Sequence, residues 1–151
     1  MSHRRLYATL LITLLATIQL GGVAKAASVA GGITASGSPG SLGGAIILTS
    51  RAPLPSLPIE VQGSVLGLAS RVGGYAVTAE IRGLTGGGFG GAYFGGGLGI
   101  GNIARDHQIG TVVTVFAGKS IAPFTSIEVR AYQALHDSGS TVGFLGLRFT
   151  F

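Results

Sequence analysis

A histidine, an aspartate and a serine lie in succession at positions 136–138. An imidazole two residues from a hydroxyl could take its proton and make it a nucleophile, provided that an acid orients the ring. The surrounding residues, His136-Asp137-Ser138-Gly139-Ser140, are also those of a polar loop. We interpret the segment as a loop and expect no catalytic residue and no enzyme activity.

Two aspartate–histidine pairs could bind a metal ion. Asp106-His107 and His136-Asp137 fall in two expected loops that lie at the same end of the fold. Imidazole and carboxylate groups suit zinc, but a site needs converging geometry as well as the right residue types. Two unrelated surface pairs are the usual explanation of such a pattern, so we predict no metal and no cofactor.

The segment "GGGFGGAYFGGGLGIG", residues 86–101, raises three further possibilities. Gly99–Ala104 has the G-x-G-x-x-A spacing of a dinucleotide loop, but no amphipathic helix follows it. A helix packed through G-x-x-x-G is disfavoured because each interior glycine costs about 1 kcal/mol relative to alanine. Phe89, Tyr93 and Phe94 argue against a disordered linker. We therefore expect a strand in the wall of a barrel, in which glycine permits curvature and leaves room inside.

The N-terminus has the pattern of a secretory signal peptide. Arg4 and Arg5 precede an uncharged run that ends at Val23, and Ala24-Lys25-Ala26 supplies small residues for cleavage. We expect a signal peptide at 1–26 and one domain at 27–151. The leader would remove Arg4, Arg5 and Lys25, so that the formal charge falls from +5 to 7 − 5 = +2. This small charge excludes nucleic acid as a partner.

The remainder of the chain predicts eight strands. Seven turn signals rich in Gly, Pro, Ser, Asn and Asp divide it into short segments, and these segments alternate polar and apolar residues with period two. Only 10% of the residues are charged, against about a quarter in a typical soluble domain. This composition favours an outer surface that faces lipid.

The charged residues of these segments share one face of each strand. A charge on a lipid-facing surface would be costly, so we expect these side chains to point into the barrel and to pair there. The predicted lumen ion-pair network comprises Glu60, Glu80, Arg82, Glu128, Arg130 and Arg148. Because an eight-stranded barrel is narrow enough for side chains to fill, such pairs would close it to flow.

The C-terminal segment "TSIEVRAYQALHDSGSTVGFLGLRFTF", residues 125–151, resembles the closing hairpin of small outer-membrane β-barrel proteins of the opacity and OmpA-like type. The resemblance implies an all-β fold, an eight-stranded antiparallel up-and-down transmembrane β-barrel in the cell outer membrane. It also implies that outer-membrane lipid and the barrel-assembly machinery are partners. The assembly signal would be the alternate apolar residues at the end of the chain, Leu145, Leu147, Phe149 and Phe151.

The expected function is a structural, envelope-integrity or surface-interaction role without an open pore. One alternative is a lipid A deacylase-like barrel enzyme using His136 and Ser138, since the His-x-Ser spacing is similar. However, Arg148, Phe149 and Thr150 stand where that family has its orienting glutamate. A second alternative is a soluble secreted β-sandwich, which would bury the apolar face instead. The pattern leaves open the strand register in 28–50 and 107–117, the specific ligand and the oligomeric state.

Overall fold

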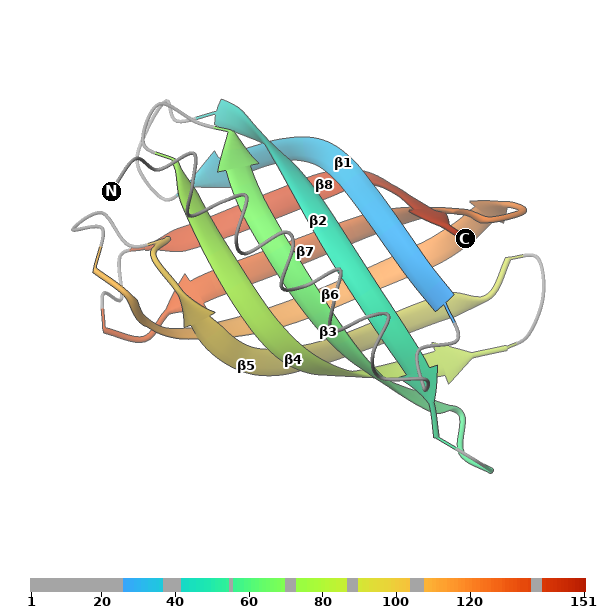
Figure 1. The fold of residues 1–151 in the computed structure, drawn as a ribbon. Helices are drawn as coiled ribbons and strands as arrows, with labels where there is room; N and C mark the ends of the chain where they lie inside the picture. The colour runs from blue at the N-terminus through green and yellow to red at the C-terminus, as the bar shows by residue number, and fades with distance from the viewer. Residues whose placement is uncertain are drawn as a thin grey trace.

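The computed structural model describes residues 26–36, 42–54, 56–69, 73–86, 90–103, 108–136 and 140–151. Eight antiparallel strands form one closed barrel, in which each strand pairs with the next and β1 pairs with β8 (Figure 1). The strands are β1 Ala26–Ser36, β2 Leu42–Pro53, β3 Ile59–Ala69, β4 Gly74–Thr85, β5 Ala92–Gly101, β6 Gly110–Ala122, β7 Thr125–Ala134 and β8 Thr141–Thr150. The predicted all-β eight-stranded up-and-down barrel is confirmed.

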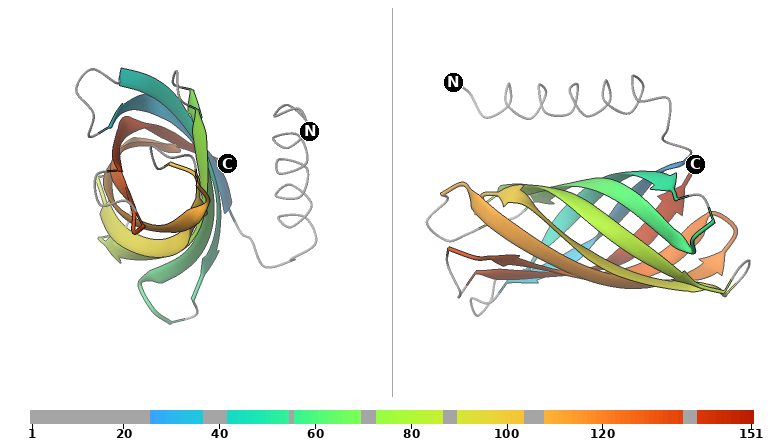
Figure 2. Two further views of the ribbon diagram at one scale, coloured as in Figure 1. Left: turned by 90° about the vertical axis from the view of Figure 1, so that its left-hand side faces the viewer. Right: turned by 90° about the horizontal axis from the view of Figure 1, so that it is seen from below.

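The two ends of the barrel differ. Viewed along its axis, the strands form a continuous ring (Figure 2). β1 begins and β8 ends at the same end, which we call the terminus end; the turns after β2, β4 and β6 also lie there. The connections after the odd-numbered strands β1, β3, β5 and β7 lie at the opposite end, which we call the loop end.

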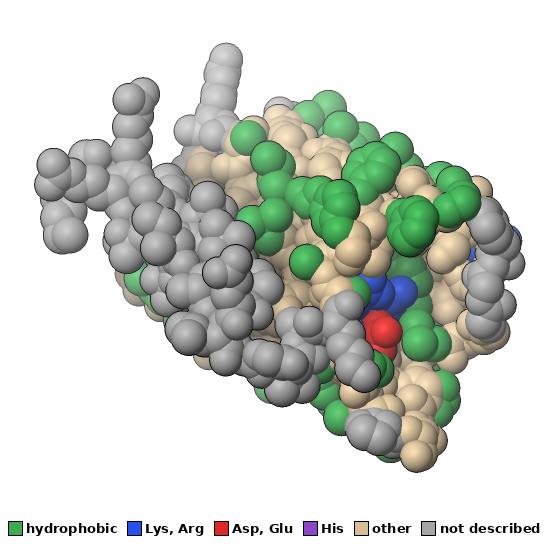
Figure 3. Space-filling model, turned by 45° about the vertical axis from the view of Figure 1, so that its right-hand side comes forward, with side chains coloured by type: hydrophobic (Ala, Val, Ile, Leu, Met, Phe, Trp, Pro, Cys, Tyr) green, Lys and Arg blue, Asp and Glu red, His purple; other side chains and the backbone are tan. Residues whose placement is uncertain are grey.

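Alternation along each strand decides which side chains enter the barrel. In β4, Thr78, Glu80 and Arg82 are buried, whereas Ala79 and Ile81 between them are exposed. Because side chains of a strand point to alternate faces, this arrangement places the polar residues inside and the apolar residues outside. Many large hydrophobic side chains are accordingly exposed on the outer surface, and Figure 3 shows those of one face in green.

The register of the two ambiguous segments is now fixed. In β2, Ala45, Ile47 and Thr49 are buried, and Ile46 is exposed. In β6, the buried residues are Val112, Thr114 and Phe116. Both segments carry large apolar residues on both faces, because the interior that they reach is itself partly apolar.

The glycine-rich segment divides into a turn and a strand. β5 begins only at Ala92, so the first part of residues 86–101 connects β4 to β5. Within β5, Gly95, Gly97, Gly99 and Gly101 have the same parity as the buried Tyr93 and form the inner face. A Cβ atom at Gly97 would lie 2.8 Å from Cγ of Glu80. The glycines therefore let neighbouring strands and their side chains pass close to β5, as the sequence predicted.

Two strands extend further than the turn signals suggested. β2 continues through Pro53, although the prolines at 53, 55 and 58 are typical of a turn. β6 continues through Ala122 with an irregularity between Ser120 and Ala122, so that Pro123 and Phe124 alone connect it to β7. Phe124 takes φ of 60° in this tight turn. Within the described ranges, no helix is long and apolar enough to cross a bilayer.

Candidate functional site

The centre of the barrel holds a compact ionic cluster formed by Glu80, Glu128, Arg130 and Arg148, which are all at most 3% exposed. Arg130 Nη1 lies 2.8 Å from Glu80 Oε1, and Arg130 Nε lies 2.5 Å from Glu128 Oε1. On the other side of Glu128, Arg148 Nη2 lies 2.8 Å from Oε1 and Arg148 Nε lies 2.7 Å from Oε2. Strand β4 is thus connected through the interior to β7 and β8, which lie far from it in the sequence.

Neutral side chains complete the coordination of the two carboxylates. The Tyr93 hydroxyl donates to Glu128 Oε2 at 2.8 Å, and Ser64 Oγ donates to Glu80 Oε2 at 3.0 Å. Gln62 Nε2 and the Thr78 hydroxyl also donate to Glu80. Buried charges are tolerated when their remaining lone pairs accept hydrogen bonds, and both carboxylates satisfy this condition.

A second, looser cluster lies toward the terminus end. Glu60 Oε2 is 3.5 Å from Arg51 Nη1 and 3.3 Å from Arg82 Nη1. Arg51 also donates from Nη2 to the Thr150 hydroxyl at 3.1 Å. The guanidinium of Arg82 stacks on the Tyr93 ring at 3.7 Å from its centroid. We call Arg51, Glu60 and Arg82 the mouth cluster.

The structure therefore brings together all six predicted network residues in two groups. Glu80, Glu128, Arg130 and Arg148 form the central cluster, while Glu60 and Arg82 belong to the mouth cluster. Arg51 was missed because the prolines that follow it suggested a turn. Its parity with the inward residues Ile47 and Thr49 was the signal that could have found it.

The loop half of the interior is apolar, which the sequence analysis did not anticipate. Ile47 and Leu66 face each other in the pairing of β2 with β3, and each is at most 1% exposed. They belong to one buried cluster, which also contains Ala30, Ala45, Ala76, Ile103, Val112, Tyr132, Ala134, Val142 and Phe144. The interior is therefore filled by ion pairs toward the terminus end and mainly by hydrocarbon toward the loop end, where Thr34 and Ser140 are also buried.

The predicted assembly residues lie on the outer surface at the end of the chain. Leu145, Leu147 and Phe149 are 42–45% exposed, and Phe151 is 77% exposed. Arg148, between two of them, is 1% exposed and points inward. The alternation expected of this C-terminal strand is thus present in the structure.

The other sequence candidates are only partly described. His136 is exposed at the loop end, while Asp137 and Ser138 lie outside the described residues, as do Asp106 and His107. The hydrolytic and metal hypotheses therefore cannot be placed in the fold. Among the described residues, no group of three or more His, Cys, Asp or Glu side chains could hold a metal ion.

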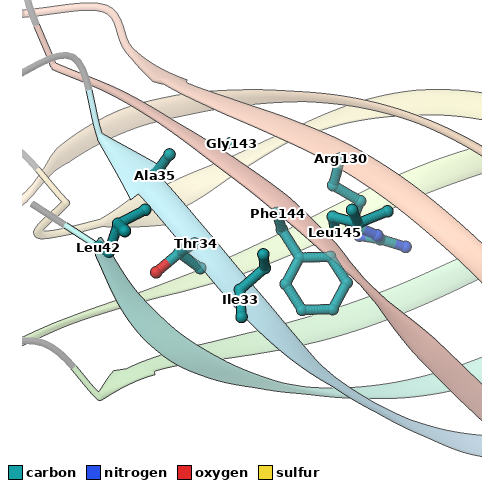
Figure 4. Close-up of a pocket in the computed structure, with 8 residues that line it drawn as sticks. All are labelled: Ile33, Thr34, Ala35, Leu42, Arg130, Gly143, Phe144 and Leu145. Carbon is teal, nitrogen blue, oxygen red and sulfur yellow. The ribbon is translucent and has the colours of Figure 1, made fainter.

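A pocket of about 240 Å³ lies at the junction of β1 and β8 (Figure 4). Its described lining includes Ile33, Leu42, Phe144 and Leu145, and Arg130 is its one ionisable residue. A second pocket of about 360 Å³ involves β6 and β7 and is lined mainly by valine and alanine. Binding sites usually place several polar groups around an apolar pocket, so these pockets resemble surface grooves more than an active site.

Comparisons with known proteins support the fold. No protein-family model matches the chain, and no curated protein sequence matches it. The solved structure of the N-terminal β-barrel domain of Pseudomonas aeruginosa OprF is similar, with a TM-score of 0.58 and 18% sequence identity. The match covers 85% of this chain and 98% of the OprF chain. At this identity the likeness supports the closed antiparallel β-barrel as the fold and does not extend to an opacity-type subfamily.

Proposed function

We propose that the protein is a small outer-membrane β-barrel with a structural, envelope-integrity or surface-interaction role, and that its filled interior prevents it from acting as an open pore. The observation that carries this proposal is the distribution of polarity. Seven of the eight charged side chains in the described residues point into the barrel, while Lys119 near the terminus end points outward. Aliphatic side chains cover the outside.

The dimensions agree with a membrane barrel. The strands contain 10–13 residues, and a tilted spanning strand needs about 9–11. A water-exposed surface with this many aliphatic groups would promote association, whereas acyl chains would solvate it. The OprF domain, with the same kind of barrel, gives this proposal a structural precedent.

Under this proposal the terminus end faces the periplasm and the signal peptide at 1–26 has been removed. The barrel-assembly machinery would read Leu145, Leu147, Phe149 and Phe151 during insertion, and outer-membrane lipid would then surround the aliphatic surface. N-terminal sequencing of the protein from the membrane fraction should begin near Ala27.

Electrophoresis without boiling tests the location. We expect the protein in the membrane fraction, where the unheated sample migrates differently from the boiled one because a closed barrel resists unfolding by detergent. A monodisperse protein that stays in plain buffer without detergent would contradict the proposal.

Conductance tests whether the interior is closed. We expect the wild type and an Arg82→Ala/Arg148→Ala double variant to leave a planar bilayer at its background conductance, because the apolar cluster still closes the loop half. Adding Ile47→Gly and Leu66→Gly should remove enough of that cluster to produce channel events. Opening by the arginine substitutions alone would show that the ion pairs are the whole barrier. Each variant is first checked for the heat-dependent shift in mobility.

A further inference from the structure

The mouth cluster contains more positive than negative charge. Arg51 and Arg82 both contact one oxygen of one carboxylate, Glu60 Oε2, at 3.5 and 3.3 Å. The ion pairs of the central cluster are shorter, at 2.5–2.8 Å. Two guanidinium groups thus share a single, weakly engaged acceptor near the terminus end.

Two donors in the mouth cluster have no acceptor. Arg51 Nε and Arg82 Nε are buried and form no hydrogen bond within the described part of the chain, and Arg82 Nη1 has only its 3.3 Å ion contact with Glu60. Both side chains are more than nine-tenths buried, being 9% and 8% exposed. Leaving a charged donor buried without an acceptor is unfavourable by several kcal/mol in the absence of compensation.

The interior as a whole has the same imbalance. Its described charged residues are four arginines, at 51, 82, 130 and 148, and three glutamates, at 60, 80 and 128, which leaves 4 − 3 = +1. In the central cluster two arginines pair with two glutamates. The excess positive charge therefore belongs to the mouth cluster, where two arginines share one glutamate. An oxyanion suits this position because a guanidinium donates two parallel hydrogen bonds to phosphate or carboxylate.

Exposed apolar side chains lie at the same end of the barrel as the mouth cluster. We define the apolar rim as Leu54, Leu57, Leu84, Phe124 and Phe151, all at the terminus end and 36–77% exposed. Figure 3, which brings the right-hand side of Figure 1 forward, shows basic and acidic atoms in a hollow bordered by hydrophobic side chains. A ligand that carries both an anionic group and a hydrocarbon part matches this combination.

We propose that the mouth of the barrel at the terminus end binds an oxyanion, a phosphate or carboxylate group, between Arg51 and Arg82, with the apolar rim favouring an amphiphile as its carrier. Glu60 competes with the ligand for the same guanidinium donors. The Arg82 guanidinium lies 3.7 Å from the centroid of the Tyr93 ring, and this stacking restrains its orientation. Binding of free phosphate does not depend on a membrane location, whereas a lipid source for the anion rests on the proposed function.

The test uses the folded barrel in a nonionic detergent, which carries no anionic group, titrated with inorganic phosphate while NMR follows the Nε–H signals of the arginines. We expect a saturable shift of the Arg51 and Arg82 signals. Arg82→Gln should weaken phosphate binding about tenfold, because it removes charge-assisted hydrogen bonds, whereas Glu60→Gln should strengthen it by removing the competitor. Lys119→Gln, which removes a cation from the outer surface near the same end, is the matched control and should leave the affinity unchanged.

A second arm identifies the source of the anion. The barrel is reconstituted in vesicles of phosphatidylcholine alone or of phosphatidylcholine with phosphatidylglycerol. A shift of the same two signals by phosphatidylglycerol, without added phosphate, supports a lipid as the source of the anion. If the signals respond to free phosphate and not to phosphatidylglycerol, the site is supported with a small anion as its ligand. No saturable shift in either arm, or equal affinities in wild type, Arg82→Gln and Glu60→Gln, would overturn the proposal. The heat-dependent mobility shift shows separately that each variant forms the barrel.

Discussion

Glu128→Gln should lower the free energy of unfolding by about 3–5 kcal/mol, the usual cost of removing one partner of a buried ion pair. The Glu128 carboxylate accepts from Arg130, Arg148 and Tyr93. A glutamine of the same shape keeps the volume but leaves two buried guanidiniums without their shared counter-charge. Urea unfolding in detergent measures the change. The folded fraction at each urea concentration is read from the difference in electrophoretic mobility between heated and unheated samples.

Glu60→Gln is the matched control for this substitution. Its side chain is 18% exposed and its contacts to arginine are 3.3–3.5 Å, so we expect a smaller loss than at Glu128, about 1–3 kcal/mol. The double variant Glu128→Gln/Arg148→Gln should recover part of the stability lost by Glu128→Gln, since it restores the balance of buried charge. Equal losses at Glu60 and Glu128 would mean that the central cluster contributes no more than the mouth cluster.

Gly97→Ala should destabilise the barrel by about 1–3 kcal/mol or more, as overpacking does in a tight interior. The added Cβ would lie 2.7 Å from Cα of Glu80 and 2.8 Å from its Cγ, and it would also meet the carbonyl oxygen of Ala79. Backbone atoms cannot move away as the end of a flexible side chain can. The strand would have to shift, and the ion pair of Glu80 with Arg130 would shift with it.

Gly63→Ala provides the comparison, because a Cβ at Gly63 would have no atom within 4 Å. We expect a change within about 0.5 kcal/mol, as at other surface positions. Refolding yield from urea into detergent, read from the same mobility shift, compares the two variants. Similar yields for Gly97→Ala and Gly63→Ala would show that the inner face of β5 has room to spare.

The fold was predictable because alternation of polarity specifies the face of each strand. Moving a strand by one residue would exchange its two faces, and Glu80-Ile81-Arg82 or Glu128-Val129-Arg130 permits only one assignment. Proline was a weaker guide, since β2 includes Pro53 at its end. Strand ends near proline therefore depended on pairing with the neighbouring strand, which local sequence does not contain.

The interior was predictable only in part. Polar residues at alternate positions identified the inward charges, but Ile46-Ile47-Leu48 offers no contrast, and the apolar half was consequently missed. Contacts such as Tyr93 with Glu128 join β5 to β7, which are not adjacent in the barrel. They depend on how far the strands are staggered around the ring, and one strand's sequence does not determine that stagger.

The enclosure of nearly all described charge has a consequence for the behaviour of the protein in salt. At 0.1 M ionic strength, dissolved ions largely screen the interaction between exposed charges that are more than about 10 Å apart, but buried pairs are screened much less. Arg130, Arg148, Glu80 and Glu128 are at most 3% exposed and have little contact with counter-ions. The electrostatic contribution to the stability of the barrel is thereby insulated from the ionic composition of its surroundings, so dilute and saline media should support the same fold.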